Sequence, residues 1–156
     1  MTDFEARIAR LEAESDIRKL KARYLNACDA KDVEAIRACF TPDASIDYAP
    51  MGEFSVDGLI DIFTAIAVGS PIIDVHQMHN GEIEVQDADH ASARWSLGFT
   101  TYDPRTRKFR VMSGFYHDEY THTPDGWLVS KTQHTPRLIL DGELAESGLR
   151  AEVLPT

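Results

Sequence analysis

The stretch DVHQMHNGEIEV, from Asp74 to Val85, has the composition of a β-strand with an interruption at Asn80-Gly81. An asparagine followed by glycine inside a strand is typical of a bulge or a bend. The stretch also carries two histidines, His76 and His79, three positions apart. Side chains alternate along a strand, so residues an odd number apart face opposite sides unless a bulge lies between them. We therefore expect one histidine to face the interior, and we favour His76 over His79.

The part of the chain before this stretch is mainly helical. Apolar residues recur at helical spacing in three segments, which are separated by turn residues such as Thr41-Pro42-Asp43 and Gly69-Ser70-Pro71. Ser15 and Asp16 could divide the first segment into a short lead helix and a longer one. We expect helices at Phe4 to Cys28, Val33 to Phe40 and Leu59 to Val68, and a short strand at Ala44 to Tyr48.

The part after it reads mainly as β-structure, with alternating apolar residues and hairpin turns. The expected strands are Ala91 to Tyr102, Phe109 to His122 and Trp127 to Leu140, with a short helix at Leu144 to Leu149. Helices first and an antiparallel sheet afterwards define an α+β protein. Long strands with bulges predict N-terminal helices packed in the concavity of a strongly curved, mostly antiparallel sheet. Such a cone has an open end, where a pocket forms.

Length and net charge limit the number of domains and the kinds of partner that we expect for this protein. The 156 residues are enough for one domain with its own core, and residues from about 140 to 156 read as a tail that forms a lid or an oligomer contact. The net charge of −10 argues against a nucleic acid or an anionic membrane as partner, since both require a basic surface. The two cysteines, Cys28 and Cys39, lie in apolar helical patterns and read as buried thiols.

No segment of the sequence predicts export, membrane insertion or a cofactor. The N-terminal stretch MTDFEARIARLEAES is charged and lacks the apolar region of a signal peptide, so we expect a cytoplasmic protein. The motifs HExxH, GxGxxG and GxSxG, the P-loop and the EF-hand loop do not occur. We therefore expect neither a metal nor a nucleotide cofactor.

Several short motifs occur in a characteristic order: Tyr24-x4-Asp29, then Phe40-Thr41-Pro42-Asp43-Ala44, then His76-x3-Asn80 with Ile83-x-Val85, then Gly126-Trp127. Together they resemble the SnoaL-like branch of the nuclear-transport-factor-two-like (cystatin-like) superfamily, over nearly the whole chain. That branch includes scytalone dehydratase, hexachlorocyclohexane dehydrochlorinase, polyketide cyclases and bile acid 7α-dehydratase. The resemblance implies a cone-shaped α+β barrel and a homo-oligomer, with a trimer favoured over a dimer.

The resemblance also implies a site. Lyases of this branch pair a histidine on the central strand with an aspartate near the end of the first long helix, and the matching residues here are His76 and Asp29. The pocket tyrosine of bile acid 7α-dehydratase would match Tyr24, and its pocket arginine would match Arg137. Its further pocket aspartate falls near Phe99 in this sequence, so that acid is missing.

The residues themselves leave alternatives open. Asp29 lies near a helix C-terminus, where the helix dipole disfavours an anion. It either pairs with Lys31 or solvent, or it orients the imidazole of His76 and stabilises the imidazolium. Tyr24 is either a core tyrosine or a hydroxyl donor to a substrate oxygen. Arg137 either binds a substrate anion or pairs with an acid of the tail, Asp141 or Glu143.

These observations lead to one functional prediction and two alternatives. We expect a cofactor-independent lyase (dehydratase-like) or isomerase that acts on a hydrophobic cyclic small molecule, with His76 as general base. The alternatives are a non-catalytic small-molecule-binding module and a polyketide cyclase of the same fold. The residues expected to bind the substrate are mostly apolar or aromatic: Trp95, Phe99, Met78, Met112, Asn80 and Tyr116.

Overall fold

A computed structural model describes residues 2–154, except for the side chain of Val153. It contains three helices and seven strands. The helices are α1 (Asp3–Ala30), α2 (Val33–Arg37) and α3 (Val56–Ile66). The strands are β1 (Phe40–Tyr48), β2 (Gly52–Phe54), β3 (Ile73–Val85), β4 (His90–Asp103), β5 (Lys108–Thr123), β6 (Gly126–Ala145) and β7 (Gly148–Leu154).

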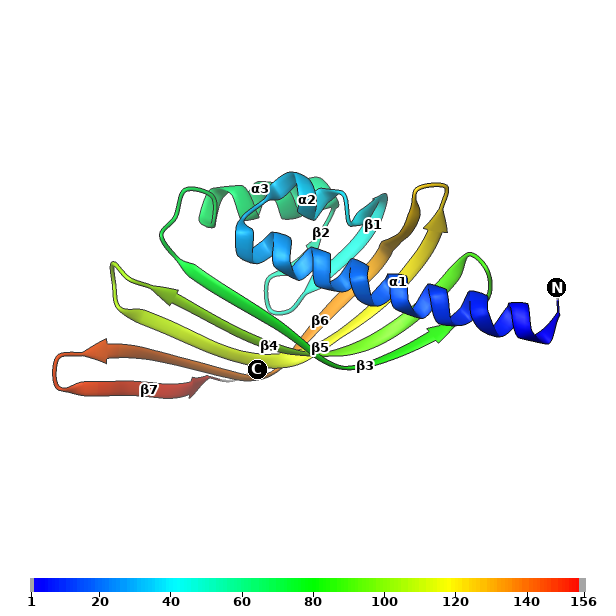
Figure 1. Ribbon diagram of the computed structural model, residues 1–156. Coiled ribbons are helices and arrows are strands. Elements are labelled where there is room, and N and C mark those ends of the chain that lie inside the picture. Colours follow the sequence, from blue (N-terminus) through cyan, green and yellow to red (C-terminus); the bar gives the residue numbers. More distant parts are fainter. Residues whose placement is uncertain (1, 155–156) are drawn as a thin grey trace.

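All seven strands form one sheet, in the order β2-β1-β6-β5-β4-β3, and β7 pairs with the far part of β6. Every pairing is antiparallel except that of β1 with β6. The sheet is strongly curved, and the helices lie together on one of its faces (Figure 1). This is the α+β architecture expected from the sequence, a cystatin-like cone with helices in its concavity.

Helix α1 is continuous over 28 residues, so Ser15 and Asp16 do not divide it into two helices. A capping box between Thr2 and Glu5 begins the helix, and Lys31 ends it in a left-handed conformation. The first half of α1 projects past the edge of the sheet (Figure 1), which leaves Phe4, Ile8 and Leu11 exposed. The second half packs on the sheet and buries the apolar residues Ile17, Leu20, Tyr24 and Cys28.

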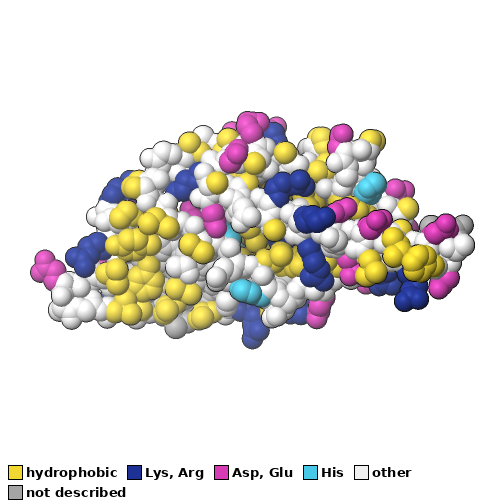
Figure 2. All heavy atoms as spheres, in the orientation of Figure 1, with side chains coloured by type: hydrophobic (Ala, Val, Ile, Leu, Met, Phe, Trp, Pro, Cys, Tyr) yellow, Lys and Arg dark blue, Asp and Glu magenta, His cyan; other side chains and the backbone are white. Residues whose placement is uncertain are grey.

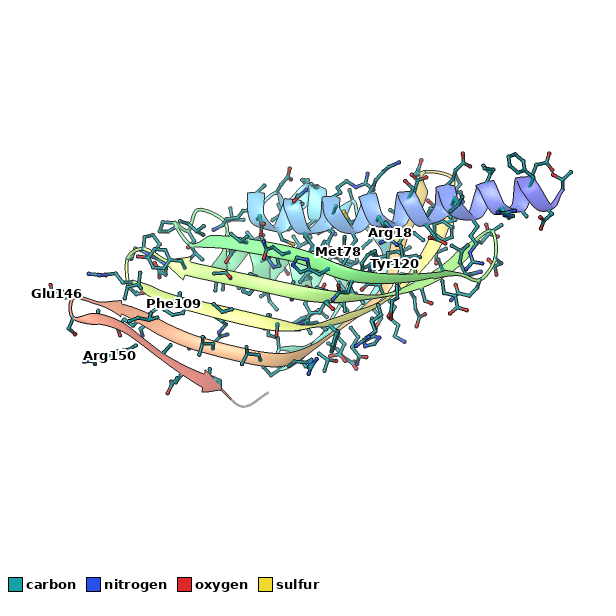
Figure 3. All side chains as sticks on the ribbon, turned by 60° about the horizontal axis from the view of Figure 1, so that its bottom comes forward. Arg18, Met78, Phe109, Tyr120, Glu146 and Arg150 are labelled. Carbon is teal, nitrogen blue, oxygen red and sulfur yellow. The ribbon has the colours of Figure 1, made fainter. Side chains whose placement is uncertain are left out.

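The C-terminal tail differs from the sequence prediction. Instead of a helix at Leu144 to Leu149, strands β6 and β7 form a hairpin, and Leu144 pairs with Leu149. Glu146 and Arg150 lie at the end of this hairpin (Figure 3). Phe109 of β5 packs beside it, where a Cβ at Gly142 would lie 2.2 Å from the Phe109 ring. The tail therefore extends the sheet at one end.

Strand β3 contains the interruption expected at Asn80-Gly81. The register with β4 shifts between His79 and Glu82, and Asn80 has a φ of 48°. A Cβ at Gly81 would lie 2.0 Å from the ring of Trp95, so only glycine fits beneath this ring. Because the shift comes after His79, the strand before it alternates regularly: His76 faces the helices and His79 faces the outside.

None of the helices within residues 2–154 is both long and apolar enough to cross a membrane.

Candidate functional site

A cavity of about 880 Å³ lies between the helices and the concave face of the sheet. Most of its wall is apolar, and one group of lining residues is polar or aromatic. The apolar wall includes Leu59, Phe63, Leu97, Phe99, Met112 and Ile139, and the polar or aromatic group includes Tyr24, Cys28, Tyr48, His76, Tyr116 and His134. Further polar and charged side chains also line the cavity: Asp74, Thr101, Asp103, Thr106, Lys108, Arg110 and Asp141. A cavity of this size and composition fits a small hydrophobic molecule with a few oxygen atoms.

Exposed apolar side chains lie at the connection from α3 to β3. Ile66, Val68 and Ile73 are 60%, 46% and 56% exposed, and Ile66 also lines the cavity. Figure 2 shows hydrophobic side chains gathered toward the side of the molecule where Figure 1 draws this connection.

The last turn of α1 and strand β3 bring Asp29 and His76 into contact. Nδ1 of His76 lies 2.6 Å from Oδ1 of Asp29, and the backbone N–H of His76 donates to both carboxylate oxygens at 3.1 Å. The His76 ring also packs against Phe99, with the ring centroids 4.4 Å apart. Lys31 lies near Asp74 instead, with Nζ 3.9 Å from that carboxylate.

This contact defines the chemistry open to His76. A carboxylate accepts a hydrogen bond, so Nδ1 carries the hydrogen and Nε2 is the nitrogen that can accept a proton. The carboxylate also stabilises the imidazolium that forms when Nε2 is protonated. The pair has the geometry of an oriented general base beside a cavity.

Two tyrosine hydroxyls meet at the same cavity. The hydroxyls of Tyr24 and Tyr48 lie 2.8 Å apart, and both rings line the cavity. Burial raises the pKa of both phenols, so both stay protonated and can donate hydrogen bonds at neutral pH. Sequence reasoning identified Tyr24 but missed Tyr48, which ends β1 beside a Pro-containing turn and resembles an ordinary strand residue.

A second imidazole, that of His134 on β6, also lines the cavity. It is 4% exposed, its ring lies 5.2 Å from the Tyr116 ring, and its Nε2 has no hydrogen-bond partner within the described chain. Burial lowers the pKa of His134, the backbone hydrogen bond with Ala49 partly opposes this, and Lys21 and His76 lower it further, so the ring is neutral near pH 7. Sequence reasoning found no role for His134, because a register shift lies between His134 and Ile139 and regular alternation would place these two residues on opposite faces.

Cys28 is a buried thiol at the cavity wall. Burial raises its pKa to about 12, which keeps the sulfur protonated and unreactive. Among residues 2–154, no group of three or more His, Cys, Asp or Glu side chains is arranged to hold a metal ion.

Arg137 lies elsewhere than expected. Its guanidinium stacks over the ring of Phe115 at 5.4 Å, and Arg94 stacks on the same ring at 4.0 Å. Asp141 forms its ion pair with Arg110, at 2.6 Å.

The β5–β6 register shifts between Ser113 and Gly114, which reverses the alternation that the sequence pattern assigned to Arg137. Arg137 is thus not among the residues that line the cavity.

The expected substrate-binding residues divide into two groups. Phe99, Met112 and Tyr116 line the cavity. Trp95 is buried behind it, where its Nε1 donates to the hydroxyl of Tyr120 at 2.9 Å and Arg18 covers its ring at 5.8 Å. Met78 packs against the core, and exposed Asn80 donates to Ser96 Oγ at 3.5 Å. These last three side chains support the sheet and its bulge and are not among the residues that line the cavity, so their expected contact with substrate stays a prediction.

The fold and the cavity define the class of this protein, a cystatin-like α+β fold with a cavity between its helices and its sheet. The chain belongs to the SnoaL-like domain family, whose model matches residues 9–133. An uncharacterized protein of Mycobacterium tuberculosis, Rv2910c, is 28% identical over 132 residues, which cover 82% of this chain and 88% of that protein.

Solved structures with a similar fold include named enzymes. The crystal structure of LinA has a TM-score of 0.77 and 17% identity, and the match covers 85% of this chain and 90% of LinA. A putative scytalone dehydratase from Novosphingobium aromaticivorans has the same TM-score and identity, over 84% of this chain and 88% of its own. A LinA type 2 hexachlorocyclohexane dehydrochlorinase has a TM-score of 0.78 and 17% identity, with coverages of 89% and 93%. At these identities the similarity is one of fold.

Proposed function

We propose that this protein is a cofactor-independent lyase of the dehydratase type, or an isomerase, and that it acts on a hydrophobic cyclic carbonyl compound. The observation that supports this best is the 2.6 Å contact between Asp29 and His76 beside an apolar cavity. The hydroxyl pair of Tyr24 and Tyr48, at the same cavity, supplies donors for an oxyanion. Named structural neighbours that are dehydratases or dehydrochlorinases make such chemistry plausible on this fold.

In the proposed reaction, Nε2 of His76 removes a proton from the carbon next to the substrate carbonyl. The electron pair of that C–H bond moves to the carbonyl oxygen, and Tyr24 or Tyr48 donates a hydrogen bond to the resulting enolate. The Asp29 carboxylate stabilises the imidazolium. Collapse of the enolate expels a hydroxyl group from the next carbon, and the imidazolium returns its proton so that water leaves. Return of the proton to another carbon gives isomerisation instead.

Typical rate effects indicate how much of the acceleration comes from the general base and how much from the oxyanion donors. A positioned general base contributes about 10²–10⁴-fold in rate. An oxyanion donor contributes about 10²–10³-fold, because it is already oriented in a site that excludes water. The base therefore accounts for only part of the acceleration that we expect, and the tyrosine pair supplies a comparable share.

Proton abstraction is testable without knowledge of the natural substrate. We would incubate the protein with α-tetralone and larger cyclic ketones in deuterium oxide and follow deuterium uptake next to the carbonyl by NMR. The wild type should accelerate the exchange, and His76→Ala should reduce it to the rate in buffer. His79→Ala is the matched control, because His79 lies on the same strand but is exposed on the outer face. Ketones that bind without any accelerated exchange would instead favour the binding-module alternative.

Trimeric assembly and a cytoplasmic location stay predictions. Sedimentation equilibrium of the full chain tests the first, and cell fractionation tests the second.

A further inference from the structure

A charged pair is enclosed behind the cavity wall. Nζ of Lys21, on α1, lies 2.9 Å from Oδ2 of Asp118, on β5, and the two residues are 1% and 2% exposed. Asp118 also accepts hydrogen bonds from the hydroxyls of Tyr120 and Thr132, each at 2.7 Å. Removing two charges from water costs several kcal/mol per ion, and their attraction repays this only when the remaining hydrogen bonds are made. Here the ion pair and both hydroxyl hydrogen bonds to Asp118 are made, so we ask what effect this buried pair has on the cavity.

The pair is oriented with respect to the cavity. The Lys21 ammonium lies 3.5 Å from the centroid of the Tyr116 ring and 5.4 Å from that of Tyr24, and both rings line the cavity. Asp118 is hydrogen-bonded to Tyr120 and Thr132, which are outside the set of lining residues. The positive end of the pair is therefore one aromatic ring away from the cavity, while the negative end points into the core.

An oriented pair of this kind has a net effect inside the cavity. Coulomb energy falls with distance, so a ligand on the far side of Tyr116 interacts more strongly with Lys21 than with the more distant Asp118. Residues that line the cavity sense both charges of the pair. Lys21 contributes to lowering the pKa of His134 and opposes the effect of burial on the pKa of Cys28, whereas Asp118 adds to the effect of burial that raises the pKa of Tyr48 and Tyr116. All four of these residues line the cavity.

We propose that Lys21 is a positioning residue that acts through Tyr116 and Tyr24 to make the cavity favour anionic aromatic or enolic oxygens, such as phenolates and the enolates of cyclic ketones. For its role in catalysis this inference rests on the proposed function, since an enolate is the anion of that reaction. As a binding property it is independent of turnover. Lys21 itself does not touch the ligand.

The probe for this preference is β-naphthol, whose neutral and anionic forms have different absorbance and fluorescence. We would titrate β-naphthol from neutral to alkaline pH, free and bound, and read the pH at which the bound form ionises. The main variant is Lys21→Met combined with Asp118→Asn, which removes both charges and keeps a hydrogen-bonding group beside Tyr120 and Thr132. The preference for naphtholate over naphthol should fall roughly three- to tenfold, the size expected for an oriented pair at an effective dielectric constant of about 20.

One further variant separates this effect from others. Ile17→Val, one helical turn before Lys21 in the same buried face of α1, lowers stability without changing charge and should leave the ionisation of bound β-naphthol unchanged. The wild-type protein separates this inference from the proposed function, because the naphthol titration needs no turnover. A naphtholate preference in a wild-type protein that does not accelerate proton exchange in α-tetralone would contradict only the proposed function.

Equal ionisation of bound β-naphthol in the wild type and in the double variant would overturn the inference. So would failure of the wild-type cavity to bind β-naphthol, because a cavity of this volume that favours phenolates should hold a bicyclic phenol. A parallel change in the Ile17→Val protein would show that the effect is one of packing, which also contradicts the proposal.

Discussion

The carboxylate of Asp29 holds His76 at two points, since one oxygen lies 2.6 Å from the ring Nδ1 and both oxygens lie 3.1 Å from the backbone nitrogen. The backbone contacts fix the end of α1 against β3, and the ring contact sets the orientation of the imidazole. An acid near the C-terminus of a helix is unfavourable with respect to the helix dipole. These three hydrogen bonds supply the compensating interaction, and they make Asp29 both a structural and a chemical partner of His76.

Replacing Asp29 with asparagine should slow proton abstraction by about 10²–10⁴-fold, because the neutral amide cannot stabilise the imidazolium. The amide oxygen can still accept from the His76 backbone, so the fold should persist. The measurement is deuterium exchange of α-tetralone, with circular dichroism to verify folding. Asp61→Asn, at an exposed position of α3, is the control and should exchange like the wild type. Unchanged exchange in Asp29→Asn would contradict the proposed mechanism.

Removing the hydroxyl of Tyr48 should lower kcat for deuterium exchange of α-tetralone by about 10²–10³-fold. This is the effect typical of losing one oxyanion donor. The Tyr48→Phe ring still fills the same space, so KM should change much less than kcat. Tyr24→Phe should behave similarly, since each hydroxyl orients the other across 2.8 Å. Tyr102→Phe on β4, which is outside the set of cavity-lining residues, is the control. If both site variants retain full kcat, the hydroxyl pair has no part in the chemistry.

The features that the sequence predicted depend on local patterns. The bulge at Asn80-Gly81, the side of β3 that carries His76, and the order of helices before sheet all follow from spacing within short segments. The features that it missed depend on pairing between distant segments. Tyr48 and His134 meet because β1 pairs in parallel with β6, and no local pattern reveals that register.

Pairing between distant segments also explains why Arg137 and Trp95 lie elsewhere than the sequence predicted. A register shift in the β5–β6 pairing decides which way Arg137 points. Trp95 looked like a pocket residue because it is large and aromatic, but its indole needs the Tyr120 hydroxyl and the space above Gly81, both of which lie behind the cavity. Burial of Lys21 could be recognised only once Asp118 was known to lie beside it.

His134 should make the protein sensitive to mild acid. Its pKa in the folded state lies below the ordinary value of 6.5, so between those two values the unfolded chain binds a proton that the folded protein does not. The contribution of His134 to stability is therefore undiminished above about pH 6.5 and is lost as the pH falls toward the lowered pKa. The backbone hydrogen bond with Ala49 opposes this shift, whereas Lys21 and His76 act in the same direction as burial and lower the pKa of His134.

The measurement is the free energy of unfolding in urea at about pH 7 and about pH 5. Between these conditions, His134→Phe should lose less stability than the wild type. His117→Gln, at an exposed position of β5, should show the full wild-type loss. An identical pH dependence in all three proteins would mean that His134 does not contribute to the acid sensitivity.

Gly81 should tolerate no side chain, because its bulge passes directly beneath Trp95. A Cβ there would lie 2.0 and 2.4 Å from two ring carbons, and the ring cannot withdraw without breaking its hydrogen bond to Tyr120. Overpacking of this kind costs about 1–3 kcal/mol. Gly58→Ala on α3 is the matched control, since its Cβ would meet only ordinary contacts at 3.5 Å or more. It should stabilise the helix by about 0.4–1 kcal/mol. Urea unfolding of both variants measures the two effects, and a Gly81→Ala protein as stable as the wild type would show that β3 can hold its bulge without this close approach.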